Sequence, residues 1–134
     1  MITLKKNIEL CKKSFSFLIT EFECKLEKII ENGNVFFDIN YAGTNKVISI
    51  SLETYENYLR VVIFDLENGK LSDYDDKAKT IHLNQLTKEY FPKISKNEIT
   101  ENSMFFKNIS TETEIEKQIV KCAKELRLVL NFIK

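Results

Sequence analysis

The sequence predicts an α+β domain in which a four- to five-stranded antiparallel meander sheet carries N-terminal and C-terminal helices on one face. Near the two ends of the chain, apolar residues recur at helical spacing, and between these segments they alternate with polar ones. Short turn sequences separate the alternating segments, as is typical of strands linked by hairpins. Two helices with single apolar stripes need a common surface to cover, and one face of the sheet supplies it.

The N-terminal segment predicts a helix over residues 3–20, with Thr3 able to cap its first turn. Its lysines fall mostly on the side that would face solvent. Its apolar residues lie alternately four and three positions apart, which places them on one helical face: Leu4, Ile8, Cys11, Phe15, Leu18 and Phe22.

Four strands are predicted to follow this helix. The first is indicated by alternation of apolar and charged residues from Phe22 to Lys28. Asn32 and Gly33 then form the strongest hairpin signal of the chain, because both residues tolerate positive φ. The other strands are expected at 34–41, 48–52 and 58–66, with turns at 42–45 and 54–57 between them.

The part of the chain after the fourth strand gives weaker signals. Residues 70–76 fit a short edge strand or a loop. Asn84 is a good N-cap for a short helix over 85–91, which Pro92 would end. Residues 93–110 are polar and predict no element, although 104–106 form one anchored apolar patch.

A long C-terminal helix is predicted over residues 112–133. Thr111 and Glu114 have the spacing of a capping box at its start. Its apolar residues again alternate by fours and threes. Because no repeat, low-complexity run or Gly/Pro-rich linker divides the chain, one domain over 1–134 is the economical interpretation.

The composition excludes several classes of protein. The 134 residues include 20 basic and 20 acidic side chains, so the formal net charge is zero, which argues against a nucleic-acid binder and favours association, for example as a homodimer. The helix lysines predict a solvated surface, since they occur with glutamates at helical spacing. No run approaches the roughly 20 apolar residues of a membrane span. Three cysteines without a CxxC pair predict reduced thiols, and hence a cytoplasmic protein.

The sequence predicts no catalytic residue, no metal site and no cofactor. His82 is the only histidine, so every Cys-His or Ser-His pair would need it, and its place before a helix favours a structural role. The three glycines all fall in predicted turns, and phosphate-binding glycine motifs are absent. Asp38, between two apolar strand residues, is expected on the open face of the sheet. The sequence does not exclude a catalytic pair of carboxylates, because it does not give distances in space.

An acidic run is the candidate binding surface. Between residues 65 and 76 the chain carries five acids against Lys70 alone, which fits either a solvated loop or a docking patch for a protein partner with a basic surface. Tyrosines inside the run and at the preceding turn would serve as aromatic anchors. The predicted partner-binding residues are Asp65, Glu67, Asp73, Tyr74, Asp75, Asp76, Tyr55 and Tyr58.

One segment resembles a known class of protein. A helix ending in Ser14-Phe15-Ser16-Phe17-Leu18 runs into Glu21-Phe22-Glu23-Cys24-Lys25-Leu26, and a meander and a C-terminal amphipathic helix follow. This layout resembles the small cytosolic immunity proteins of bacterial polymorphic toxin systems. Those relatives often have an arginine-containing polar strand after the meander, whereas here Arg60 is the only arginine near it. The resemblance implies neutralisation of a toxin domain by direct binding, without catalysis.

The leading hypothesis is therefore a non-enzymatic protein-binding module. Two alternatives stay open. A helix, a meander and further helices would also suit a dimeric secretion chaperone that holds an export substrate. A pocket between sheet and helices would suit a small-ligand carrier or an enzyme that uses carboxylates.

Overall fold

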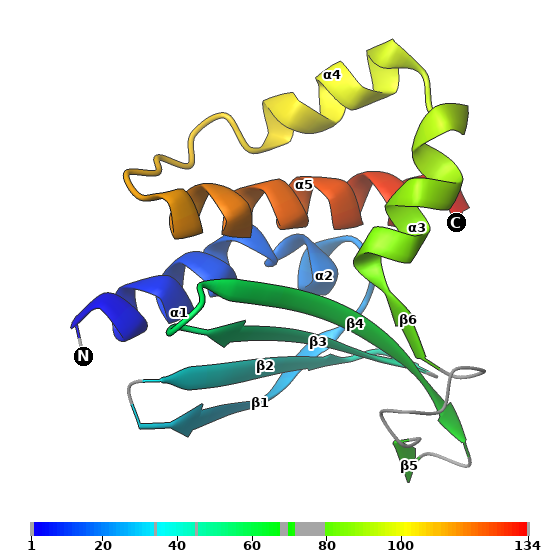
Figure 1. Cartoon of the computed structure of the whole chain (residues 1–134). Coiled ribbons are helices and arrows are strands. Elements are labelled where there is room, and N and C mark those ends of the chain that lie inside the picture. Colours follow the sequence, from blue (N-terminus) through cyan, green and yellow to red (C-terminus); the bar gives the residue numbers. More distant parts are fainter. Residues whose placement is uncertain (1, 34, 45, 68–69, 72–79, 134) are drawn as a thin grey trace.

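The computed structural model describes the whole chain except residues 1, 34, 45, 68–69, 72–79 and 134 (Figure 1). A twisted antiparallel sheet forms one layer, and helices cover one of its faces. The strands follow one another in the order β1-β2-β3-β4-β5, and β6 pairs with β4 beside this path. The predicted α+β class and the antiparallel meander are confirmed.

The ends of the first four strands differ from the predicted ends by at most four residues. Gly33 has φ 60° in the turn between the first two strands, as the Asn-Gly signal predicts. The short strand β5 covers only the start of the predicted segment 70–76, and the rest of that segment lies outside the described residues. The bounds are β1 Lys25–Asn32, β2 Phe36–Ala42, β3 Lys46–Glu53, β4 Tyr58–Glu67, β5 Lys70–Leu71 and β6 Thr80–His82.

The predicted N-terminal helix 3–20 is wrong in one respect, because the structure divides it into α1 (Ile2–Ser14) and α2 (Phe17–Thr20). The hydroxyl of Ser16 donates to the carbonyl of Lys13 at 2.9 Å, and so competes with the regular helical hydrogen bonds. Phe15 and Phe17 are both fully buried, which an uninterrupted helix does not favour for residues two positions apart.

The first strand also begins later than predicted. Glu23 has φ 57°, a left-handed conformation that a strand residue cannot adopt. Phe22 and Cys24 therefore belong to the connection from α2, and the strand starts at Lys25. The register of β1 against β2 shifts between Leu26 and Lys28, which marks a β-bulge.

The C-terminal part contains more helix than the sequence predicts. The helices are α3 (Leu83–Tyr90), a 3₁₀ turn η1 (Phe91–Lys93), α4 (Lys96–Phe105) and α5 (Glu114–Ile133). Helix α4 occupies the segment 93–110 for which no element was predicted. Of the predicted apolar patch 104–106, only Phe106 is buried, whereas Met104 and Phe105 are exposed.

Three predicted helix caps are wrong. Thr3 lies inside α1, which begins at Ile2. His82, not Asn84, is the N-cap of α3, and its backbone N–H donates to Oε1 of Gln85 at 2.8 Å. At the start of α5 the capping box is formed by Thr113 and Glu116, two positions later than predicted. The N–H of Thr113 donates to Oε1 of Glu116 at 3.1 Å, and the N–H of Glu116 donates to Oγ1 of Thr113 at 3.2 Å.

The core lies between the sheet and the helices α1, α2, α3 and α5. Phe17 of α2 is fully buried, and its ring meets those of Phe22 and Phe106 edge to face. Phe106 therefore connects the end of α4 to the core, while the rest of α4 packs on α5 (Figure 1). The largest fully buried side chains from the sheet and α5 are Phe37, Ile39, Tyr41, Ile48, Ile50, Leu52, Ile119, Leu126 and Val129.

Candidate functional site

The predicted partner-binding residues that the structure describes lie in two separate places. Asp65 and Glu67 lie near the end of β4, whereas Tyr55 and Tyr58 lie at the turn where β4 begins. Seven residue steps of strand separate Tyr58 from Asp65, which corresponds to about 23 Å. The two tyrosines are strongly exposed, but they cannot serve as anchors next to these acids. The remaining predicted residues, Asp73, Tyr74, Asp75 and Asp76, lie outside the described residues.

The open face of the sheet carries a small polar cluster. Asp38, Ser51 and Arg60 are opposite one another on β2, β3 and β4. The hydroxyl of Ser49 donates to Oδ1 of Asp38 at 2.6 Å, a short charge-assisted hydrogen bond. Asp38 lies on the open face, as the sequence predicts, and this hydrogen bond gives it a structural role. The hollow beside it, about 140 Å³, has room for only a small molecule.

His82 borders another shallow hollow of about 280 Å³ at the free end of β4. Helix α5 contributes Lys121, Cys122 and Glu125 to the same hollow. Burial and, to a smaller extent, the charge of Glu125 raise the pKa of the Cys122 thiol to about 12, so the thiol is protonated at neutral pH. A protonated thiol is a poor nucleophile, so this pair of Cys and His is not prepared for covalent catalysis.

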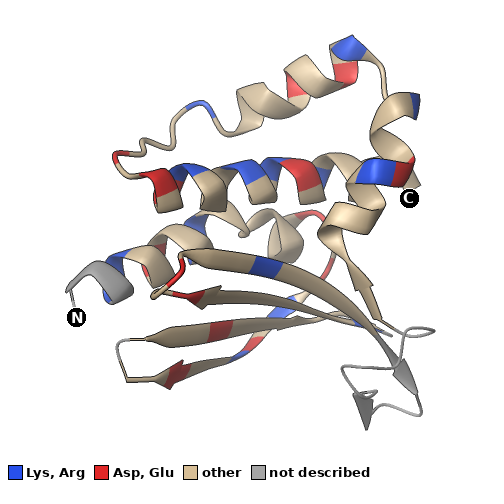
Figure 2. Cartoon of the chain, in the orientation of Figure 1, with Lys and Arg blue, Asp and Glu red and all other residues tan. Residues whose placement is uncertain are grey.

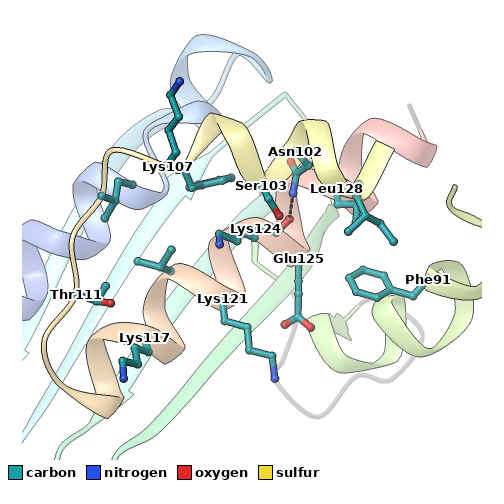
Figure 3. A pocket seen from close by; sticks show the side chains of 14 residues that line it. Phe91, Asn102, Ser103, Lys107, Thr111, Lys117, Lys121, Lys124, Glu125 and Leu128 are labelled. Carbon is teal, nitrogen blue, oxygen red and sulfur yellow. Dashed lines mark hydrogen bonds between the residues drawn. The ribbon is translucent and has the colours of Figure 1, made fainter. Parts of the chain in front are cut away.

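A hollow larger than the two above lies between α4 and α5, and we call it the α4–α5 groove (Figure 3). Its volume is about 490 Å³, within the range of ligand-binding pockets. Helix α4 forms one wall, α5 forms the other, and residues 106–111 close one end. Six apolar side chains line it: Phe91, Ile99, Phe106, Ile109, Val120 and Leu128.

The charged residues of the groove are mostly basic. Four lysines and one glutamate line it, which leaves three positive charges in excess on a chain of zero net charge. Figure 2 shows how basic residues repeat along α5. The lysines are Lys107, Lys117, Lys121 and Lys124. Such a surface attracts an anionic ligand, and the lysine stems extend its apolar lining.

Glu125 is the single acid of the groove. Partial burial raises its pKa, although the charge of Lys121, one turn earlier on α5, acts in the opposite direction. Desolvation of the carboxylate therefore outweighs its attraction to the lysine. The bias of the groove toward anionic ligands is strengthened whenever Glu125 takes up a proton.

A network around Arg127 holds α4 against α5. The guanidinium donates to both carboxylate oxygens of Glu21 at 3.0 Å and to Oδ1 of Asn102 at 2.8 Å. It also stacks on the ring of Phe105, 3.9 Å from its centroid. Asn102 donates in turn to the carbonyl of Lys124 at 2.8 Å, which Figure 3 marks as a dashed line. These contacts fix the distance between the two walls of the groove.

Sequence reasoning missed this groove because it assigned no element to residues 93–110. A signal was present, since Ser95 and Glu98 have the spacing of a capping box. The N–H of Glu98 donates to Oγ of Ser95 at 3.2 Å. The lysines at 117, 121 and 124 also share one helical face, but the sequence does not reveal that α4 lies beside them.

The other two thiols are buried away from the groove. Burial raises the pKa of both the Cys11 and the Cys24 thiol. Within the described part of the chain, no three histidine, cysteine or carboxylate side chains come together as ligands for a metal ion. Among the helices of the described ranges, none is both long enough and apolar enough to cross a membrane.

Comparisons with protein-family models, with curated proteins and with solved structures found no match. The function of the chain is therefore argued from its own surfaces.

Proposed function

We propose that the chain is a non-enzymatic protein-binding module that holds an acidic segment of a partner protein in the α4–α5 groove. The observation that carries this proposal is the combination of an apolar lining with three excess positive charges in one groove. Apolar contacts would supply affinity, and the lysines would select acidic segments and accelerate the encounter.

The chemistry of the described side chains supports binding rather than catalysis. The pKa values of all three thiols are raised by burial, so each thiol stays protonated at neutral pH. The groove itself contains lysines, one glutamate, Asn102, Ser103 and Thr111 as its polar residues, and His82 is not among its lining residues. We therefore assign these polar residues to binding and not to nucleophilic catalysis.

A labelled acidic peptide rich in leucine tests the proposal by fluorescence anisotropy. We expect binding to the wild-type chain that weakens with salt, because screening acts on exposed charges. The triple variant Lys117→Glu, Lys121→Glu and Lys124→Glu should bind at least ~100-fold more weakly, if each reversed charge costs about 1 kcal/mol. A version of the peptide with lysine in place of every acid should bind the triple variant more tightly than the wild-type chain.

The matched control carries the same change of charge at exposed lysines that line none of the hollows described above: Lys13→Glu, Lys28→Glu and Lys88→Glu. It should bind the acidic peptide within about threefold of wild type, since surface charges far from a contact mainly affect the encounter rate. Equal loss of affinity in both triple variants would contradict the groove as the site. Both variants should keep the wild-type circular dichroism spectrum.

Toxin neutralisation in the cytoplasm would be one role for such a module. Its support is the resemblance of the sequence layout to that of small immunity proteins, together with three free cysteines. The predicted partner with a basic surface would use the acidic run 65–76, a different surface from the groove. Co-expression with a toxin domain encoded beside this gene tests the role, and unchanged toxicity would contradict it.

A further inference from the structure

The walls of the α4–α5 groove are two helical stripes. On α4 the lining residues are Ile99, Asn102, Ser103 and Phe106, at the spacing of one helical face. On α5 they are Lys117, Val120, Lys121, Lys124, Glu125 and Leu128, again one face over three turns. Two adjacent helices with such stripes leave a channel between their ridges, into which a third helix packs.

We infer that the occupant of the groove is an amphipathic helix with acidic residues at positions i, i+4 and i+7 or, in the other chain direction, i, i+3 and i+7. This inference rests on the proposed function of the groove and names the conformation and the charge pattern of the partner. The α5 stripe from Lys117 to Leu128 is about 16 Å long at 1.5 Å per residue, which corresponds to three turns.

The spacing of the lysines sets the charge pattern. Lys117, Lys121 and Lys124 are four and three residues apart on one face of α5. A helix that lies alongside α5 has the same rise per residue, so acids at matching spacing face these lysines one by one. Apolar residues on the adjacent stripe of the partner would then meet the more exposed apolar residues of the lining, which are Phe91, Ile99 and Ile109.

An extended segment fits the groove less well than a helix. Both long walls are helices, whose backbone groups are already hydrogen-bonded within each helix. An extended chain would bring unpaired N–H and C=O groups into an apolar channel without a strand edge to pair with. A helix satisfies its own backbone and presents only side chains.

A single-chain anionic amphiphile also fits less well. Its apolar chain could lie on the lining residues, but its one head group would neutralise one lysine. The three lysines on α5 span about 10 Å, which is more than one carboxylate can contact. A helix with three acids pairs with all of them.

The test uses a peptide of about four turns, or roughly 15 residues, with an apolar stripe and three glutamates at the stated spacing. A second peptide has proline at the central exposed position, which breaks the helix but keeps the charge. We expect at least ~10-fold weaker binding of the proline peptide, because proline removes a backbone hydrogen bond and opposes the helical conformation. Equal binding of both peptides would overturn the helical occupant while leaving the proposed function intact.

Charge reversal at one register position tests the spacing. Lys121 is the middle lysine, so the middle glutamate of the peptide faces it in either chain direction. Lys121→Glu should weaken binding about 10-fold, and replacement of the middle glutamate by lysine should restore it. Lys13→Glu should show neither effect. Absence of rescue by the swapped peptide would overturn the assigned spacing.

Dodecanoate serves as the probe for an amphiphile. We expect it neither to bind at micromolar concentration nor to displace the helical peptide. Dodecanoate binding to a protein that binds none of the acidic peptides would overturn both the helical occupant and the proposed function.

Discussion

Glu116 shows how a single carboxylate organises the start of α5. Its Oε1 accepts hydrogen bonds from the N–H groups of Glu112 at 2.6 Å and Thr113 at 3.1 Å, and Nζ of Lys6 lies 3.4 Å from its Oε2. The backbone hydrogen bonds are the largest cause that lowers its pKa below the usual value of 4.5, and Lys6 adds to them. The ionised carboxylate is therefore stabilised by folding.

This coupling predicts a pH dependence of stability. A carboxylate with a lowered pKa stabilises the folded state fully above its unfolded-state pKa, and the contribution is lost as pH falls through the lower folded-state value. Glu116→Gln should therefore lower the free energy of unfolding at pH 7 and have a smaller effect below pH 4.5. Urea denaturation of both proteins over a pH series measures this. A difference in the free energy of unfolding between the two proteins that stays the same at every pH would contradict the prediction.

Arg127 stabilises the contact between α4 and α5, and its replacement should lower the stability of the protein. Lysine keeps the charge at this position, but it cannot make paired hydrogen bonds to Glu21 while it stacks on Phe105. Arg127→Lys should cost about 2 kcal/mol of stability, since charged hydrogen bonds in a partly buried site are lost. Amide exchange in α4 should accelerate more than exchange in β2 and β3. Uniform acceleration in helix and sheet would contradict a local role.

Single residues also show why the predicted caps were partly wrong. The segment 111–116 reads Thr-Glu-Thr-Glu-Ile-Glu, so two overlapping capping boxes are present in the sequence. The choice of Thr113 is consistent with the contact of Glu116 with Lys6, which belongs to α1 and lies 110 positions earlier in the chain. A tertiary contact of this kind is invisible to local patterns.

Among the elements, α4 depends on its N-cap Ser95, and α4 forms one wall of the groove. Ser95→Ala removes the acceptor for the N–H of Glu98 and should destabilise α4 by about 1 kcal/mol. Hydrogen exchange over 96–105 should accelerate, and the acidic peptide should bind more weakly. Asn84→Ala is the control, because Asn84 lies inside α3 and caps no helix. If Asn84→Ala accelerated hydrogen exchange at the start of α3 more than Ser95→Ala accelerates it in α4, the assignment of His82 as the N-cap of α3 would be contradicted.

The elements that were predicted from sequence are those with a strong local pattern. The helix α5 has one buried face, and in β3 the apolar residues Ile48, Ile50 and Leu52 alternate with polar ones although both faces are buried, so the apolar periodicity is clear. Helix α4 packs mainly on α5 and exposes Ile99, Met104 and Phe105, so it lacks such a stripe. The division of the first helix likewise depends on a side-chain contact of Ser16, which periodicity does not reveal.

At the scale of the whole molecule, zero net charge conceals a strongly charged site. The α4–α5 groove gathers lysines from α5 and from the segment after α4, while Glu125 is the only acid of the described residues that lines it. The sequence predicts the sheet and its helical cover, because hairpins and stripes are local. It does not predict the groove, which requires the position of α4 beside α5. The separation of Tyr58 from Asp65 follows already from the predicted strand 58–66, which the structure has as β4.

The most direct test of the groove as the binding site is a map of amide chemical shifts during titration with the acidic helical peptide. We predict that the shifted amides lie in 96–107 and 117–128 and that those of 38–40, 49–51 and 60–62 on the sheet stay unchanged. Shifts confined to the open sheet face or to the turn around Tyr55 would contradict the account.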